Sequence, residues 1–167
     1  IFTSELANAL PALPPFVQKA VENSPEMAWV NEMPYSSQLR AIDPLTGKAL
    51  WAIEQEGWQD RGGVLVTKSN LLFHGTVGGK FNARDSRDGN LLKSIETGTS
   101  IFAAPMTYEV GGTQYVAVAA GWGGGGWSYV PDISAAYRYE NTNRILVFKL
   151  GGGPVTKPEA LPELEVA

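Results

Sequence analysis

The protein has 167 residues, of which 44% are apolar, enough for one folded domain with a hydrophobic core. Its 19 glycines and 11 prolines favour short strands joined by tight turns over a helical bundle. The net charge of −4 argues against nucleic acid or an anionic membrane as the main partner, because both bind positively charged surfaces. No run of residues is long and apolar enough to span a bilayer. An all-β fold is therefore expected.

The chain contains no cysteine, so it has no disulfide, no thiolate metal site and no c-type haem attachment motif of its own. It starts with Ile1, which is neither an initiator methionine nor the beginning of a signal peptide, and this indicates an internal or truncated piece. Residues 1–37 mix small apolar residues with prolines. They predict an irregular connection that holds a turn or two of helix.

From Gln38 onward the sequence repeats itself. Residues 41–51 (Ala-Ile-Asp-Pro-Leu-Thr-Gly-Lys-Ala-Leu-Trp) match residues 83–93 (Ala-Arg-Asp-Ser-Arg-Asp-Gly-Asn-Leu-Leu-Lys). The offset of about forty residues is the period of one four-stranded propeller blade following another. Each copy predicts a hairpin, in which the Asp accepts N–H groups of the turn and the Gly takes a positive φ.

Further short apolar runs predict the remaining strands. They cover residues 64–66, 71–76, 80–85, 104–110, 113–120 and 144–150. Residues 38–153 are therefore interpreted as propeller blades made of antiparallel four-stranded sheets, and the Pro/Glu-rich residues 154–167 as a linker. Two blades cannot close a ring, so this stretch alone would leave apolar sheet faces exposed.

The skeleton Ala-x-Asp-x-x-Thr-Gly-x-x-x-Trp of residues 41–51 resembles the docking motif of the eight-bladed quinoprotein alcohol dehydrogenases, which use pyrroloquinoline quinone (PQQ). In that family the tryptophan, here Trp51, packs between adjacent blades. The order of the motifs over residues 38–153 is also similar, and it implies the last blades of the propeller. The ending Val-Phe-x-Leu-Gly-Gly at 147–152 most resembles the quinohaemoprotein branch, in which a Pro-rich linker leads to a cytochrome c domain.

A glycine-rich stretch, residues 121–127, follows a predicted strand. Its backbone can approach a flat ligand closely, and its first Trp offers a π surface. Composition alone favours a flexible loop without a ligand. The stretch also spells G-x-G-x-x-G, but the aromatic, proline-broken residues that follow do not form the helix a dinucleotide site requires. The resemblance implies that four residues lie beside the quinone: Gly121, Trp122, Gly123 and Gly124.

Arg61 precedes Gly62-Gly63, at a place where the family usually has a Trp or Asn that hydrogen-bonds the cofactor. An arginine could bind a cofactor carboxylate in a bidentate manner. An exposed loop pair of Asp60 and Arg61 that contributes little is an equally good interpretation, and both stay open. His74 is the only histidine, lies in an apolar run, and is interpreted as a core residue without chemistry.

The resemblance implies oxidation of an alcohol to an aldehyde by hydride transfer to PQQ, with calcium as Lewis acid and an Asp as base. In the family those groups belong to earlier blades, so no catalytic residue or metal ligand is assigned here and the chain alone is predicted inactive. The resemblance further implies a periplasmic location, a cytochrome c or quinone as electron acceptor, and haem c in a downstream domain. The alternative is a non-catalytic propeller scaffold, which the Gly-Trp-Gly-Gly loop disfavours.

Overall fold

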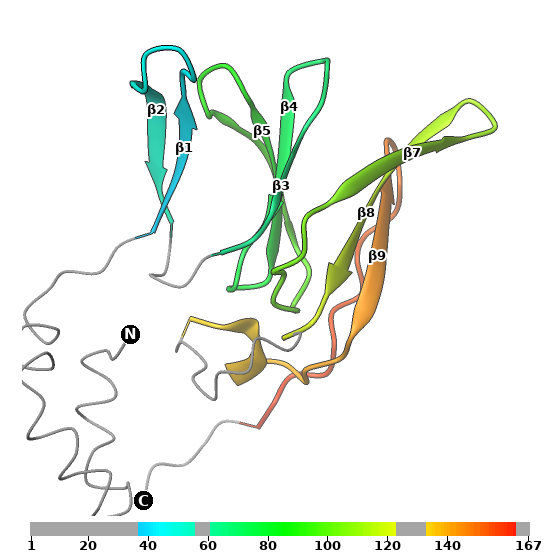
Figure 1. Ribbon diagram of the computed structural model, residues 1–167. Coiled ribbons are helices and arrows are strands. Elements are labelled where there is room, and N and C mark those ends of the chain that lie inside the picture. Colours follow the sequence, from blue (N-terminus) through cyan, green and yellow to red (C-terminus); the bar gives the residue numbers. More distant parts are fainter. Residues whose placement is uncertain (1–36, 56–60, 123–132, 163–167) are drawn as a thin grey trace, which may run out of the picture. The chain divides into compact units, whose positions relative to one another are not determined.

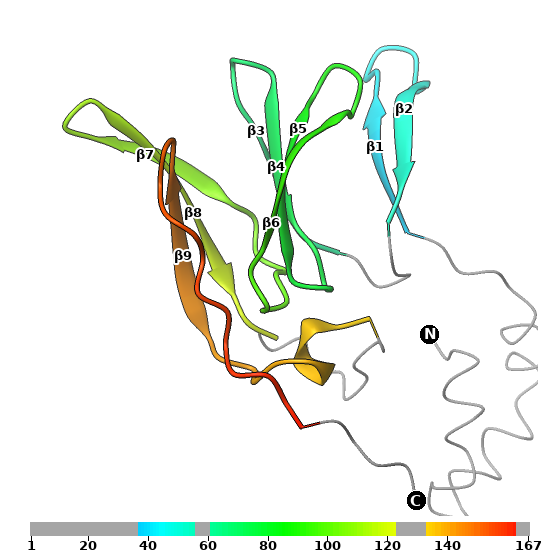
Figure 2. The same ribbon diagram turned by 180° about the vertical axis from the view of Figure 1, so that it is seen from behind.

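The computed structural model describes residues 37–55, 61–122 and 133–162, which form three antiparallel sheets (Figures 1 and 2). The sheets have the strand orders β1-β2, β3-β4-β5-β6 and β7-β8-β9, so the expected all-β class is confirmed. Among these residues no helix is long and apolar enough to cross a membrane. The predicted connection of residues 1–36 lies outside the described part. The elements are β1 (Gln38–Ile42), β2 (Ala49–Glu54), β3 (Val64–Val66), β4 (Leu71–Gly75), β5 (Lys80–Asp85), β6 (Leu91–Glu96), β7 (Met106–Val110), β8 (Thr113–Ala120), the 3-10 turn η2 (Ala135–Tyr137) and β9 (Arg144–Lys149).

The two copies of the repeated motif fold into the same turn in two different sheets. Asp43 and Asp85 each accept, through Oδ1, the backbone N–H two positions further on, at 2.9 Å. The N–H of Gly47 or Gly89 bonds to the carbonyl of the same Asp at 2.8 Å. These glycines have φ values of 69° and 78°, which cost little without a side chain. Both predicted hairpins are confirmed.

The strands lie within one or two residues of their predicted bounds. β3 and β8 match the predicted runs, while β4 and β9 each end one residue earlier than predicted. β7 begins at Met106 although the prediction began at Ala104. The intervening Pro105 has no N–H to donate, so it does not enter the ladder. The second sheet is a complete four-stranded meander, as the blade interpretation requires.

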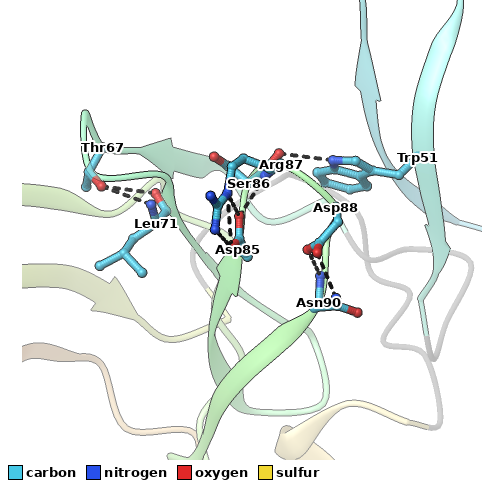
Figure 3. Close-up of polar contacts among 8 residues, drawn as sticks. All are labelled: Trp51, Thr67, Leu71, Asp85, Ser86, Arg87, Asp88 and Asn90. Carbon is cyan, nitrogen blue, oxygen red and sulfur yellow. Dashed lines mark hydrogen bonds and ion pairs between the residues drawn. The ribbon is translucent and has the colours of Figure 1, made fainter.

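Trp51 on β2 links the first sheet to the second (Figure 3). Its indole Nε1 donates a hydrogen bond to the carbonyl of Ser86, with a donor–acceptor distance of 3.0 Å. A Cβ on Gly89 would lie 3.0 Å from Cε3 of the indole, so the ring packs directly on this glycine. Lys93 holds the equivalent register position in the second copy and is exposed. The first motif therefore docks onto the turn of the second.

Apolar side chains of the second and third sheets form the core. The rings of Phe81 on β5 and Phe148 on β9 stack with centroids 4.6 Å apart and planes 5° apart. Removal of this apolar surface from water stabilises the contact between the two sheets. The buried cluster consists of Phe81, Ile101, Val118, Ala120 and Leu146.

The third sheet exposes large apolar side chains. Ile145, Met106 and Val110 keep 76%, 62% and 61% of their surface accessible. Isolated exposed apolar residues are ordinary, but several on one three-stranded sheet are typical of a surface that packs against another element. The exposure agrees with the expectation that these blades do not bury all of their faces by themselves.

Residues 154–162, at the start of the predicted linker, run back along β9 (Figure 2). Val155 packs against the core. Nη1 of Arg144 donates to the carbonyl of Thr156 at 2.7 Å, and the N–H of Glu140 donates to the carbonyl of Glu159 at 2.9 Å. This part of the tail is therefore bonded to the last sheet. That the tail leads to a further domain stays a prediction.

We expect Trp51→Ala to destabilise the full-length gene product that contains this sequence by about 2 kcal/mol, because it removes a half-buried ring and one hydrogen bond. Trp51→Phe keeps most of the apolar area and should lose roughly half as much. The denaturant concentration at the unfolding midpoint measures both effects. An unchanged midpoint for Trp51→Ala would show that the indole does not hold the two sheets together.

Candidate functional site

Gly121 directly follows β8 and is fixed by its backbone. Its N–H donates to the carbonyl of Ser100 at 2.8 Å. Ser100 is 1% exposed, and its hydroxyl bonds to the carbonyl of Val77 at 2.7 Å and to the hydroxyl of Ser134 at 2.9 Å. A Cβ at Gly121 would collide with the side-chain oxygen of Asn143. A side chain at Gly121 would have to displace the Asn143 carboxamide, and the hydrogen bond to Ser100 determines where the backbone lies.

Trp122 is held by two further contacts. Its backbone N–H donates to Oδ1 of Asn141 at 3.0 Å. Its ring meets Phe102 edge to face, with centroids 5.1 Å apart and an interplanar angle of 88°, a favoured geometry for an aromatic pair. As a whole residue, Trp122 is partly accessible. The other two predicted loop residues, Gly123 and Gly124, lie outside the described residues.

A cavity of about 540 Å³ borders this loop. Its wall is mainly apolar, with Gly121 and Phe102 on it, and the polar groups of Asn143 and Arg144 enter it from the segment that leads into β9. Arg144 uses its terminal nitrogens for Thr97 and Thr156, whereas its buried Nε has no protein partner among the described residues. An apolar cavity with a few directed polar groups is the usual form of a small-molecule site.

Arg61 is exposed and begins the second described segment. The two glycines after it are closely packed: a Cβ on Gly62 would collide with the carbonyl of Gly75, and one on Gly63 would lie 2.6 Å from Ala104. The N–H of Gly63 also donates to the carbonyl of Phe102 at 3.2 Å. Phe102 thus contacts both candidate segments, through its backbone on one side and its ring on the other.

Phe102 and Asn141, which contact Trp122, and Asn143, whose side chain lies against Gly121, were not identified from the sequence. None of them belongs to a repeated motif. Each lies at least nineteen residues away in sequence from the loop residue that it contacts, and Asn141 contacts a backbone atom of Trp122. The run Asn141-Thr142-Asn143 was a visible turn signal, but it did not indicate a partner. Within the described segments no group of three or more His, Cys, Asp or Glu residues is placed to bind a metal.

His74 on β4 is 3% exposed, and its Nε2 accepts a hydrogen bond from Nε of Arg84 at 3.2 Å. Arg84 also donates to the carbonyl of Gly89, in the turn that Trp51 contacts. Burial, and then the charge of Arg84, lower the pKa of His74 from 6.5 to about 4. The imidazole is therefore a neutral acceptor at pH 7. Its interpretation as a buried core residue is confirmed.

A family model described as the β-propeller domain of glucose, ethanol and alcohol dehydrogenases, named for PQQ, matches residues 23–116, more than half of the chain. The chain belongs to the quinoprotein alcohol dehydrogenase family. The repeat, the docking tryptophan and the four-stranded sheet are thus features of a PQQ propeller.

Curated members of this quinoprotein family are similar over three quarters of the chain. The 1-butanol dehydrogenase (cytochrome c) of Thauera butanivorans is 41% identical over 128 residues, which are 74% of this chain and 18% of that protein. The quinohemoprotein alcohol dehydrogenase ADH IIB of Pseudomonas putida is 39% identical over 126 residues, 75% of this chain and 18% of that protein. The chain therefore spans about a fifth of the length of these relatives.

Solved structures of quinohemoproteins have the same fold. Alcohol dehydrogenase ADHIIG of Pseudomonas putida HK5 superposes with a TM-score of 0.67 at 31% identity, covering 83% of this chain and 20% of that one. The quinohemoprotein alcohol dehydrogenase of Comamonas testosteroni gives a TM-score of 0.64 at 33% identity, with the same coverage. The predicted propeller fold is confirmed.

The lowered pKa of His74 predicts how stability changes with pH. An unfolded histidine takes up a proton near pH 6.5, whereas the folded site resists protonation until about pH 4. The contribution of neutral His74 to the free energy of unfolding is fully present above pH 6.5. It is lost as the pH falls toward 4, by about 3 kcal/mol in total. His74→Gln keeps an acceptor for Arg84 but does not titrate.

The measurement compares denaturant midpoints of the wild-type full-length gene product and His74→Gln at pH 7 and pH 4.5. We expect the wild type to lose more stability than the variant over this interval. Equal losses would show that His74 carries no linked proton.

Proposed function

We propose that this chain forms the C-terminal blades of a PQQ-dependent alcohol dehydrogenase and supplies one wall of its cofactor chamber. The observation that carries the proposal is the fixed Gly121-Trp122 backbone beside a mainly apolar cavity, in a chain of the quinoprotein family. When bound, PQQ would accept a hydride from an alcohol and leave an aldehyde. The residues of this chain bind and orient; none of those described acts as the base.

The described residues fit a planar, anionic quinone. Gly121 lines the cavity, and because it has no side chain its backbone borders that space. The Trp122 indole would lie beside the flat ring system of the cofactor. Arg61 would bind a cofactor carboxylate through paired guanidinium N–H groups. Gly123 and Gly124, which lie outside the described residues, are proposed as further cofactor contacts.

Other parts of a longer protein would complete the enzyme. Calcium ligands and the catalytic Asp would come from other blades, which would also cover the apolar face of β7 and β9. Electrons would pass to a cytochrome c or a quinone acceptor, through haem c if a cytochrome domain follows the tail, and the enzyme would work in the periplasm. The 167-residue chain alone would be inactive because it has no complete chamber.

Titration of the calcium-loaded full-length gene product with PQQ tests this function. We expect saturable binding and PQQ-dependent oxidation of an alcohol. Arg61→Ala should weaken PQQ binding about tenfold, because it removes charge-assisted hydrogen bonds to a carboxylate. Arg87→Ala is the matched control, since this exposed arginine pairs with Asp85 in a turn of the second motif.

Absence of PQQ binding by the wild type would contradict the proposed function and favour a non-catalytic propeller. Unchanged affinity in Arg61→Ala would remove Arg61 from the site while leaving the function in place.

A further inference from the structure

Arg84 connects the buried His74 to the turn on which Trp51 docks. Its Nε donates to Nε2 of His74 at 3.2 Å, and its Nη1 donates to the carbonyl of Gly89 at 3.0 Å. Gly89 is the residue on which the indole packs, and Nε1 of Trp51 donates to the carbonyl of Ser86 in the same turn (Figure 3). One guanidinium therefore links the interior of the second sheet to the contact between the first and second sheets.

His74 lies in a row across the second sheet whose other members do not titrate. Its partners on the neighbouring strands are Val64 of β3 and Asn82 of β5, and Asn82 lies opposite Ser94 of β6. The charge that acts on the pKa of the imidazole is that of Arg84. The charge state of His74 and the position of Arg84 therefore depend on each other.

Charged side chains of the adjoining elements bond within the turn, face an opposite charge or lie on another face. Lys80 of β5 is directly opposite Glu96 of β6, one row further along the second sheet. Those of the turn are Arg87, Asp85 and Asp88, and those on the face of the first sheet opposite to Trp51 are Arg40 and Glu54.

A proton on His74 breaks the connection to the turn. The neutral ring accepts from Arg84 through Nε2, whereas the protonated ring donates from both nitrogens and repels the guanidinium. Asn82, the cross-strand neighbour of His74, has a buried Oδ1 without a partner among the described residues, so an acceptor for the protonated ring is close by. Arg84 then turns away from the ring, and its bond to Gly89 is lost.

The sign of the pH effect follows from the surroundings of His74. In the closed arrangement burial, and then the charge of Arg84, lower the pKa of His74 from 6.5 to about 4. Opening of the turn moves the guanidinium away and admits water, so it raises this pKa. Opening therefore takes up a proton between about pH 6.5 and 4, and the open form gains as the pH falls.

We propose that neutral His74 positions Arg84 to hold the docking turn closed, and that protonation of His74 releases Trp51 and loosens the first sheet from the second. This goes beyond a general loss of stability in acid, because it places the first opening at one contact between two sheets. The inference does not depend on the proposed function, since neither residue is assigned to the cofactor wall.

Hydrogen exchange followed by mass spectrometry measures this opening in the full-length gene product. The amides to follow are those of residues 85–90, because the N–H of Gly89 bonds to the carbonyl of Asp85 in the closed turn. Residues 43–48 are the matched control, since they fold into the same turn in the first sheet. Wild type and His74→Gln are compared at the same pH, so that the intrinsic exchange rates cancel.

We expect the ratio of wild-type to His74→Gln exchange in residues 85–90 to rise about tenfold between pH 7 and pH 4.5, because opening takes up a proton. The ratio should stay unchanged in residues 43–48 and rise less in β8, whose amides report overall stability. Arg84→Met keeps the length of the side chain but has no donor. Its turn should exchange faster than the wild type at pH 7, with a smaller further rise in acid.

Trp51→Phe tests whether the turn and the docking contact open together. It removes the donor to Ser86 and should raise exchange in residues 85–90 about fivefold at pH 4.5, the effect of one hydrogen bond. Unchanged exchange in Trp51→Phe would show that the turn opens with the indole in place, which overturns the inference.

A ratio for residues 85–90 that is equal at the two pH values would also overturn it. So would an equal rise in β8, which would show that acid acts on the whole fold, or an acid response of Arg84→Met as large as that of the wild type. If His74→Gln does not fold, the comparison of the wild type with Arg84→Met over the same pH interval decides the question.

Discussion

The sheets of this protein depend on contact with their neighbours, because a two- to four-stranded sheet cannot bury both of its faces alone. The stacked rings of Phe81 and Phe148 close one such contact, between the second and third sheets. Trp51 closes another by reaching from the first sheet to the turn at Ser86 and Gly89. The candidate site lies on a loop whose backbone is anchored by the same packed sheets, so its geometry follows from blade packing.

The repeat gave reliable predictions because its chemistry is local. An Asp that accepts turn N–H groups and a Gly with positive φ determine a hairpin within a few residues, and both copies fold as predicted. Strand bounds were also close, since alternation and glycine breaks are local signals. The start of β7 differed because Pro105 cannot join the ladder.

The site was less accessible to prediction because its contacts are distant in sequence. Gly121 and Trp122 were expected beside a ligand through family resemblance, but the residues that hold them were not identified. Phe102 and Asn141 lie in irregular segments, where no periodicity indicates which way a side chain points. The packing of the tail was hidden for the same reason: its Pro/Glu composition is typical of a linker, although Val155 reaches the core.

The contribution of this chain to the proposed enzyme is one of shape. The described part contributes the Trp122 ring, the Gly121 backbone and the Arg61 guanidinium to the proposed site. These groups suit the binding and orientation of a cofactor whose own chemistry does the oxidation. In the proposed enzyme, this segment, which covers about a fifth of the length of its relatives, would affect cofactor affinity without supplying a general base.

The most direct measurement is a structure of the full-length gene product crystallised with PQQ and calcium. We predict that the quinone ring lies within about 4 Å of the Trp122 indole, the distance of van der Waals contact, with the Gly121 backbone at its border. PQQ bound with none of its atoms within about 4.5 Å of Trp122 would contradict the account.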